Sequence, residues 1–137
     1  MKYNKFRISF DFDGTLDDEF GGIYNKQKEE VQKIAKNYIN QGHDVCIITK
    51  RFGPEFPTQG IGNEHLVVFE LAKELGIQKI YFTNREMKFS KILELKIEKH
   101  FENSQYEVDL INQKCQEVNH KCLVIPVEDP YWRDLVY

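Results

Sequence analysis

The sequence lacks long hydrophobic runs, a strong excess of charge of either sign, and any internal repeat or low-complexity tract. None of its apolar runs approaches the ~18 residues that a membrane-spanning helix needs, so no membrane span is expected. Its 19 basic and 22 acidic residues give a net charge of −3, which provides no electrostatic footprint for nucleic acid or for an anionic membrane surface. These absences exclude the simplest membrane-bound and nucleic-acid-binding classes.

Cysteine is also scarce. Cys46, Cys115 and Cys122 are an odd number, and no signal-peptide core precedes the first expected strand, so we expect reduced thiols in a cytoplasmic protein. Cys46 lies in an apolar run and is expected to be a small buried side chain. Cys115 and Cys122 lack the close paired spacing of a zinc site, and a zinc site that adds His120 is disfavoured.

Apolar runs and helical patterns alternate along the whole chain. This order predicts an α/β protein: a three-layer αβα, Rossmann-like fold with a central parallel sheet of about five strands, formed by residues 1–137 as one domain. In such a sheet, ligands bind beyond the carboxyl ends of the strands. The expected strands are 5–12, 44–49, 79–83, 97–101 and 121–127; the expected helices are 25–40, 64–75, 88–95 and 106–118, with a helical turn or tail at 129–137.

The most informative segment, residues 10–16, reads Phe-Asp-Phe-Asp-Gly-Thr-Leu at the end of an apolar run. In a strand, residues i and i+2 point to the same side, so Asp11 and Asp13 are expected to leave the strand close together. Two carboxylates that near repel each other unless a cation or a shared proton compensates. The pattern predicts a magnesium-assisted site in which Asp11 attacks phosphorus and Asp13 transfers protons. The alternative is an ordinary Asp/Gly turn after a strand.

This segment resembles the first motif of the haloacid dehalogenase (HAD) superfamily of phosphatases, since Asp-x-Asp-Gly-Thr after a hydrophobic strand is uncommon by chance. The resemblance implies the same roles for Asp11 and Asp13, and adds that the backbone carbonyl of Asp13 binds Mg²⁺. Gly14 allows the backbone to turn with no side chain in the way, and the Thr15 hydroxyl is expected to hold that turn. Both residues are predicted to shape the phosphate-binding loop.

A second motif of the family is matched at the end of the second expected strand. There the resemblance implies that Thr49 and the backbone amide of Lys50 hydrogen-bond the transferring phosphoryl group. Arg51 is a further candidate phosphate contact, because a guanidinium binds phosphate in a bidentate manner. The alternatives are a structural Thr49 and a solvated Arg51.

A phosphatase site also needs a fixed cation to neutralise the phosphoryl oxygens and the attacking carboxylate. Lys88 and Lys91 lie three residues apart at the start of an expected helix, and so nearly on one face. The family's third motif is a lysine that opens the helix before the fourth strand. Lys88 fits that position best, and Lys91 is the alternative.

The fourth motif is where the chain departs from the family. Two adjacent acids are usual after the fourth strand, whereas this chain has Glu102 followed by Asn103. The predicted Mg²⁺ ligands are therefore Asp11, Asp13, Glu102 and Asn103, with water completing the octahedral oxygen coordination that Mg²⁺ favours. Asp109 is expected to be too far away and solvated.

The leading hypothesis is a magnesium-dependent phosphatase that hydrolyses a phosphomonoester through an aspartyl-phosphate on Asp11. A catalytically weak or inactive HAD-like binding or regulatory domain is the alternative, because Glu102 and Asn103 replace the usual acidic pair. A phospho-accepting receiver domain is disfavoured, since receivers place the phospho-acceptor on a later strand than the acid pair.

The chain is expected to lack the cap domain that many HAD phosphatases carry. Only residues 17–24 separate the first motif from the first expected helix, a segment that is too short for a cap, and there is no other large insertion. An open site suits a larger phosphorylated substrate or a partner that supplies a lid. A small substrate would instead require the 52–63 loop to fold over the site. Near the end of the chain, a buried Trp132 would pack at the sheet edge, whereas an exposed Tyr131–Trp132 pair would form a homo-oligomer contact.

Overall fold

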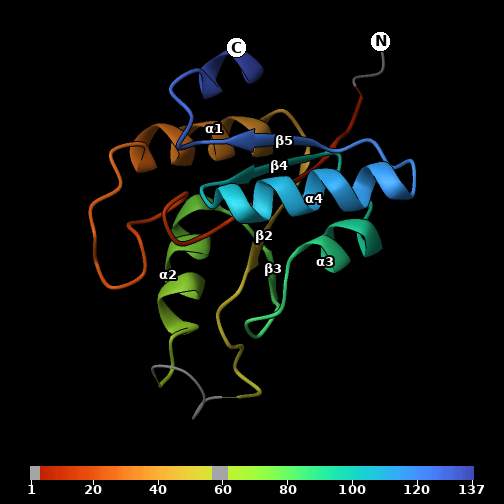
Figure 1. Ribbon diagram of the computed structural model, residues 1–137. Helices are drawn as coiled ribbons and strands as arrows, with labels where there is room; N and C mark the ends of the chain where they lie inside the picture. The colour runs from red at the N-terminus through yellow and green to blue at the C-terminus, as the bar shows by residue number, and fades with distance from the viewer. Residues whose placement is uncertain (1–3, 57–61) are drawn as a thin grey trace.

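Five parallel strands form the centre of the structure, a computed structural model that describes residues 4–56 and 62–137 (Figure 1). The strand order is β3-β2-β1-β4-β5, and every pairing is parallel. The predicted Rossmann-like three-layer fold is confirmed. The strands are β1 (Arg7–Phe10), β2 (Asp44–Thr49), β3 (Lys79–Phe82), β4 (Lys99–Glu102) and β5 (Leu123–Pro126).

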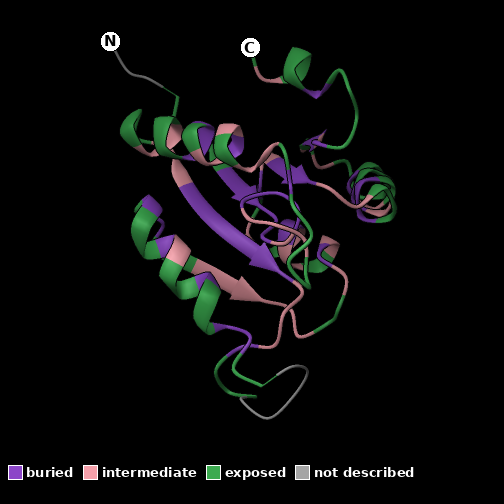
Figure 2. Cartoon of the chain, turned by 90° about the vertical axis from the view of Figure 1, so that its left-hand side faces the viewer, coloured by how far each residue is buried: buried purple, intermediate pink, exposed green. Residues whose placement is uncertain are grey.

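Helices cover both faces of the sheet, which lies between them in Figure 2 with its buried strands at the centre. Side chains of α1 and α2 join one hydrophobic cluster and those of α3 and α4 join another. The chain moves outward from β1 to β3 and then returns to β4, so the strand order reverses between β1 and β4. Such a switch point is where open α/β sheets bind ligands. The helices are α1 (Lys28–Asn40), α2 (Leu66–Leu75), α3 (Phe89–Glu94) and α4 (Gln105–Glu117), followed by the 3₁₀ turn η1 (Trp132–Leu135).

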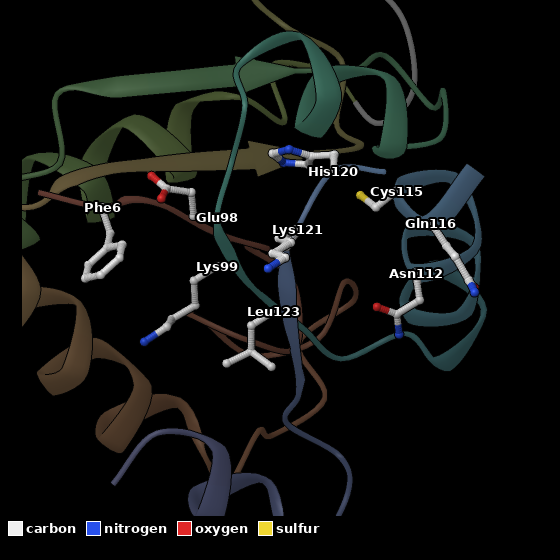
Figure 3. A pocket seen from close by; sticks show the side chains of 10 residues that line it. Phe6, Glu98, Lys99, Asn112, Cys115, Gln116, His120, Lys121 and Leu123 are labelled. Carbon is white, nitrogen blue, oxygen red and sulfur yellow. The ribbon is translucent and has the colours of Figure 1, made fainter. Parts of the chain in front are cut away.

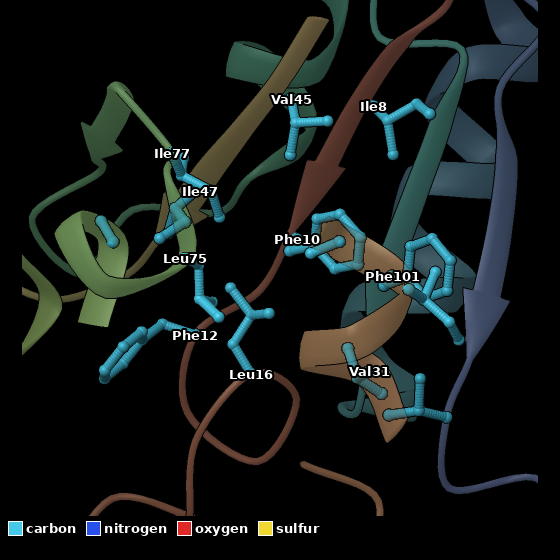
Figure 4. Packing of buried hydrophobic residues seen from close by; sticks show 14 of the residues in the cluster. Ile8, Phe10, Phe12, Leu16, Val31, Val45, Ile47, Leu75, Ile77 and Phe101 are labelled. Carbon is cyan, nitrogen blue, oxygen red and sulfur yellow. The ribbon is translucent and has the colours of Figure 1, made fainter. Parts of the chain in front are cut away.

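The face of the sheet under α1 and α2 is entirely apolar near the switch point. The rings of Phe10 and Phe101 stack with centroids 4.5 Å apart and contribute to the cluster that Figure 4 shows. Val31 of α1 and Leu75 of α2 belong to the same cluster. Burying each large apolar side chain contributes about 1.5–3 kcal/mol, so this face provides much of the stability that holds β1 against β4.

The face under α3 and α4 differs, because the alternate residues of β1 and β4 are polar. Ser9, His100 and Glu102 are buried, each with relative exposure of 0%. Alternation along a strand places them on the side opposite Phe10 and Phe101. Buried polar groups need hydrogen-bond partners, so this side of the sheet carries a polar network rather than a simple core.

Two strand ends differ from the prediction. β1 ends at Phe10 rather than at residue 12, because Phe12 turns into the core and its carbonyl accepts the amides of three of the residues that follow. β4 covers Lys99–Glu102 rather than 97–101, so Glu102 is the last residue of the strand instead of following it.

The loop before α1 is held by one side chain. The Asn25 amide donates to the carbonyls of Thr15 and Asp17, each at 3.1 Å. Its oxygen accepts the Gln27 amide at 3.0 Å. Because these hydrogen bonds give the chain a non-helical turn, α1 begins at Lys28, later than predicted.

Trp132 is buried against the first cluster, with 1% relative exposure, while Tyr131 is exposed. The packing alternative is therefore correct for Trp132, and an exposed Tyr131–Trp132 pair is not formed. Residues 57–61, which belong to the loop expected to cover the site for a small substrate, lie outside the described residues. Within the described ranges, no helix is both long and apolar enough to cross a membrane.

Candidate active site

The candidate site lies at the carboxyl ends of β1 and β4, at the switch point of the sheet. Asp11 follows β1 directly, and its amide donates to the Phe101 carbonyl at 2.9 Å. Glu102 ends β4. Lys88 lies just before α3 and reaches both carboxylates. The sheet therefore brings together three residues that are far apart in the sequence.

Lys88 is the predicted motif lysine that reaches the site. Its Nζ lies 2.7 Å from Asp11 Oδ1 and 2.8 Å from Glu102 Oε1, and its side chain is 3% exposed. Lys91, the alternative, pairs with Glu94 on the surface instead. Burial lowers the pKa of Lys88, but the charges of Asp11 and Glu102 outweigh it, so the pKa lies above its ordinary value. Lys88 is thus a fixed cation.

The two carboxylates share this one cation unequally. Burial and the charge of Glu102 raise the pKa of Asp11 to about 7, against the opposing effects of Lys88 and Thr15. Burial also opposes ionisation of Glu102, yet Lys88 and His100 outweigh it and lower its pKa to about 2. Glu102 is therefore ionised at neutral pH, whereas the ionised form of Asp11 is only partly stabilised by its surroundings.

Glu102 is held by a buried chain of hydrogen bonds that the sequence analysis missed. His100 Nε2 lies 2.9 Å from Glu102 Oε1, and His100 Nδ1 lies 2.7 Å from Ser9 Oγ. The Ser104 amide donates to Glu102 Oε2 at 3.2 Å. Burial lowers the pKa of His100, so we assign a neutral ring with the proton on Nε2. Alternation along β4 places His100 and Glu102 on the same side, which was a usable sequence signal.

The Asp13 side chain is paired with the Arg51 guanidinium. Arg51 Nε and Nη2 donate to the two Asp13 oxygens at 3.0 and 2.7 Å. Arg51 Nη1 donates to the Glu64 carbonyl at 2.6 Å. Asp11 contacts Lys88 instead, so the two carboxylates have different cationic partners among the described residues. The Arg51 guanidinium is thus engaged by protein groups instead of being a solvated loop cation.

The loop after Asp11 fits around Asn103. Gly14 has φ +75°, and a Cβ built on it would lie 2.2 Å from Asn103 Nδ2. A side chain at Gly14 would therefore displace Asn103. The Thr15 hydroxyl donates to Asp11 Oδ2 at 3.0 Å, so it orients the carboxylate in addition to any role in the turn.

Thr49 and Lys50 lie at the end of β2, beside this group. Thr49 is buried, and its hydroxyl accepts the Arg51 amide at 3.3 Å. Lys50 Nζ lies 3.9 Å from Glu107 Oε2. Glu107, which the sequence analysis missed, accepts the Lys88 amide at 3.1 Å through Oε1. Its buried Oε2 has no hydrogen-bond partner among the described residues. The only feature of the sequence that could have indicated Glu107 is that an acidic residue lies in the first turn of α4. Asp109 is exposed, as expected.

The predicted metal ligands do not converge as a cluster of carboxylates. Among the residues that the structure describes, no group of three or more His, Cys, Asp or Glu side chains is arranged to hold a metal ion. The Lys88 ammonium bridges Asp11 and Glu102, and both Glu102 oxygens already accept hydrogen bonds. The remaining donor types are the Asp11 carboxylate, the Asp13 backbone carbonyl and the Asn103 amide oxygen. These suit Mg²⁺, which takes oxygen ligands and keeps several waters.

Two hollows lie at opposite ends of the sheet. One of about 240 Å³ adjoins the site and is lined by Asp13, Phe20, Lys50, Arg51 and Arg85. The other, of about 510 Å³, lies at the amino ends of β4 and β5 beside the last turns of α4 (Figure 3). Its lining combines aliphatic, aromatic, amide and thiol groups with the charged side chains of Glu98, Lys99 and Lys121.

Comparisons of the chain with protein-family models, with curated proteins and with solved structures find no match.

Proposed function

We propose that this chain is a magnesium-dependent phosphatase of the HAD type, which hydrolyses a phosphomonoester through an aspartyl-phosphate on Asp11. The observation that carries the proposal is the buried contact of Lys88 with Asp11 at 2.7 Å and with Glu102 at 2.8 Å, at the switch point of a parallel sheet. The resemblance of residues 10–16 to the first HAD motif supports it independently. We also propose a cytoplasmic location, which the three unpaired cysteines support.

Asp11 is the proposed nucleophile because its carboxylate is oriented from both sides. Lys88 holds Oδ1 and the Thr15 hydroxyl holds Oδ2, so the carboxylate is fixed before substrate binds. Preorganised donors of this kind stabilise developing charge without reorganisation during the reaction. Bound Mg²⁺, held by Asp11, the Asp13 carbonyl and Asn103, would neutralise the charge on the phosphoryl oxygens.

Asp13 is the proposed general acid and base. It would protonate the leaving oxygen and then accept a proton from the water that hydrolyses the aspartyl-phosphate. Because Arg51 holds both Asp13 oxygens, Asp13 must exchange at least one of these hydrogen bonds for a contact with the substrate. Arg51 positions Asp13 until that exchange occurs.

Two observations favour the second candidate, a HAD-like binding or regulatory domain with weak or no turnover. Arg51 forms an ion pair with Asp13, and the described residues hold no three-carboxylate cluster for a metal. Such a domain would retain the fold and the Lys88 network without completing the reaction.

The test is release of 4-nitrophenol from 4-nitrophenyl phosphate, with Mg²⁺ and with a chelator, by the wild type and by Asp11→Asn. We expect Mg²⁺-dependent turnover that falls at least ~10³-fold in Asp11→Asn, because the nucleophile is lost. The matched control is Asp44→Asn, which removes a partly exposed carboxylate at the amino end of β2 and should leave turnover unchanged. Turnover that survives in Asp11→Asn would contradict the proposal, and Mg²⁺ binding without turnover would favour the second candidate.

A further inference from the structure

The hollow beside the site concentrates positive charge. Its lining contains three cationic side chains, Lys50, Arg51 and Arg85, against the one carboxylate of Asp13. The chain as a whole has a net charge of −3, so this lining departs from the average surface in sign. A concave surface of one sign raises the local concentration of ligands of the opposite sign.

The cations are ordered around aromatic rings. The Arg51 guanidinium lies 5.1 Å from the Phe12 ring centroid and 4.8 Å from that of Phe20. Arg85 lies 4.7 Å from the Phe52 ring and 5.8 Å from the Phe20 ring. Guanidinium–ring contacts at these distances are favourable and restrict the rotamers of long side chains. The positive lining is therefore partly preorganised.

The three cations differ in how far protein groups already engage them. Arg51 is committed to Asp13 and to the Glu64 carbonyl, and its side chain is only 12% exposed. Arg85 pairs with Glu64 at 2.7 and 2.9 Å, yet its side chain remains 42% exposed. Within the described ranges, the Lys50 ammonium has one charged partner, Glu107 at 3.9 Å, and its side chain is 36% exposed. Lys50 and Arg85 are thus the cations that a ligand can reach.

The position of Asp13 decides which part of a substrate meets them. If Asp13 protonates the leaving oxygen, the leaving group lies on the Asp13 side of the phosphorus, and Asp13 lines this hollow. The phosphoryl group itself lies on the other side, with Asp11 and Lys88. Lys50 and Arg85 therefore face the leaving group rather than the transferred phosphoryl group.

Resting on the proposed function, we propose that the substrate is a phosphomonoester whose leaving group carries a second anionic group, a carboxylate or a further phosphate, bound by Lys50 and Arg85. Phe20, whose side chain is 40% exposed at the same hollow, offers a flat face to a planar portion of that leaving group. A neutral sugar or alkyl leaving group would gain nothing from these cations.

The test uses phosphonates, which bind without being hydrolysed. Calorimetric titrations with Mg²⁺ compare benzylphosphonate, its 4-carboxy derivative, its 4-phosphono derivative and its 4-aminomethyl derivative. We expect both anionic derivatives to bind about tenfold more tightly than benzylphosphonate, and the cationic derivative to bind less tightly. The preference should shrink at high salt, because these groups are partly exposed. A preference confined to one derivative would identify the anion as carboxylate or phosphate.

Two variants assign the preference to the hollow. Lys50→Gln and Arg85→Gln should each bring the ratio of affinities for the 4-carboxy and parent phosphonates toward one. Arg85→Gln also removes one partner of the Glu64 carboxylate, so thermal unfolding is recorded. Lys50→Gln keeps the test valid if Arg85→Gln unfolds. Lys79→Gln, which removes a 57% exposed lysine at the amino end of the sheet, should leave the ratio unchanged.

The results separate this inference from the proposed phosphatase activity. Equal affinities for all the phosphonates, no binding of any, or a ratio unchanged in both variants would overturn the anion preference. Turnover of 4-nitrophenyl phosphate without the preference would leave a phosphatase of different specificity. The preference without turnover would support the anion site while rejecting the phosphatase.

Discussion

The two ends of the sheet differ in where they place their charges. At the carboxyl end, Lys88 and Asp11 are almost completely buried, with 3% and 6% of their side chains exposed. At the amino end, the pair formed by Lys79 and Asp44 is 57% and 32% exposed. The hollow at the amino end is nevertheless about twice the size of the other, about 510 against about 240 Å³. The larger hollow is therefore not the one that adjoins the buried charges.

Burial acts on a thiol at the amino end and on paired charges at the carboxyl end. At the amino end, burial raises the pKa of the Cys122 thiol to about 12, which keeps it protonated and unreactive. At the carboxyl end, Lys88 and Glu102 remain charged in spite of burial, since each lies within hydrogen-bond distance of the other. Strongly shifted pKa values of this kind cluster at functional sites, although structural ion-pair networks also produce them.

The largest expected effect comes from exchanging a lysine at each end. Lys88→Met should lower turnover of an aryl phosphate by about 10²–10³-fold or more, because removing one preorganised donor to developing charge has an effect of that order. Lys121→Met, at the hollow of the amino end, should leave turnover unchanged. Steady-state kinetics of both variants measure this, and less than a tenfold loss in Lys88→Met would remove the distinction between the ends.

The second effect is on stability and depends on pH. The pKa of Asp11 rises from 3.8 to about 7 on folding, so the folded state binds more protons than the unfolded state between these values. The wild type should therefore lose stability as the pH rises from about 4 to about 7. Asp11→Asn lacks this loss and should be more stable than the wild type at pH 8 by about 2–4 kcal/mol in metal-free buffer.

Urea unfolding with a chelator, at several pH values, measures that difference. Asp44→Asn should differ from the wild type by less than ~0.5 kcal/mol at each pH, since its ion pair is partly exposed. The pH dependence of stability due to Glu102 has the opposite sign. Because its pKa is lowered from 4.5 to about 2 on folding, Glu102 stabilises the folded state above about pH 4.5, and this stabilisation is lost as the pH falls toward 2. A stability gap between wild type and Asp11→Asn that stays constant with pH would show that Asp11 does not titrate as described.

A third comparison uses one glycine at each end. Gly14 and Gly42 both have positive φ, +75° and +88°, but a Cβ at Gly42 meets nothing within 4 Å. Gly42→Ala should cost only the backbone strain of ~1–2 kcal/mol. Gly14→Ala should cost ~1–2 kcal/mol more, because it must also displace Asn103. Denaturant unfolding measures both, and the double variant Gly14→Ala/Asn103→Ala should recover the additional cost.

The smallest effect sharpens the role of Asn103. Asn103→Asp restores an acid next to Glu102 and should raise the affinity for Mg²⁺ about tenfold, because a carboxylate is a stronger Mg²⁺ ligand than an amide oxygen. Asn112→Asp, at the hollow of the amino end, should not change it. Calorimetric titration measures the Mg²⁺ affinity of the wild type and of both variants. Equal affinities in these three proteins would indicate that Asn103 does not contact the metal.

The sequence by itself determined the local features of this protein. The alternation of apolar runs and helical patterns is enough for the parallel α/β sheet, and β2 was predicted with the bounds that it has. Gly76 ends α2 in the left-handed conformation, which glycine commonly adopts just after the last turn of a helix. The carboxylates of residues 10–16 were located at a strand end in the same way. These features depend on neighbours along the chain, which a sequence displays directly.

Only the tertiary structure decided which charges meet. Lys88 and Asp11 are 77 residues apart, Ser9 and His100 are 91 apart, and the pairing of β1 with β4 brings Ser9 and His100 into register. Arg51 contacts Asp13, 38 residues away, a partner that its place in the sequence did not indicate. Strand order and side-chain partners depend on long-range packing and on the need to compensate buried charge, neither of which leaves a periodic pattern in the sequence.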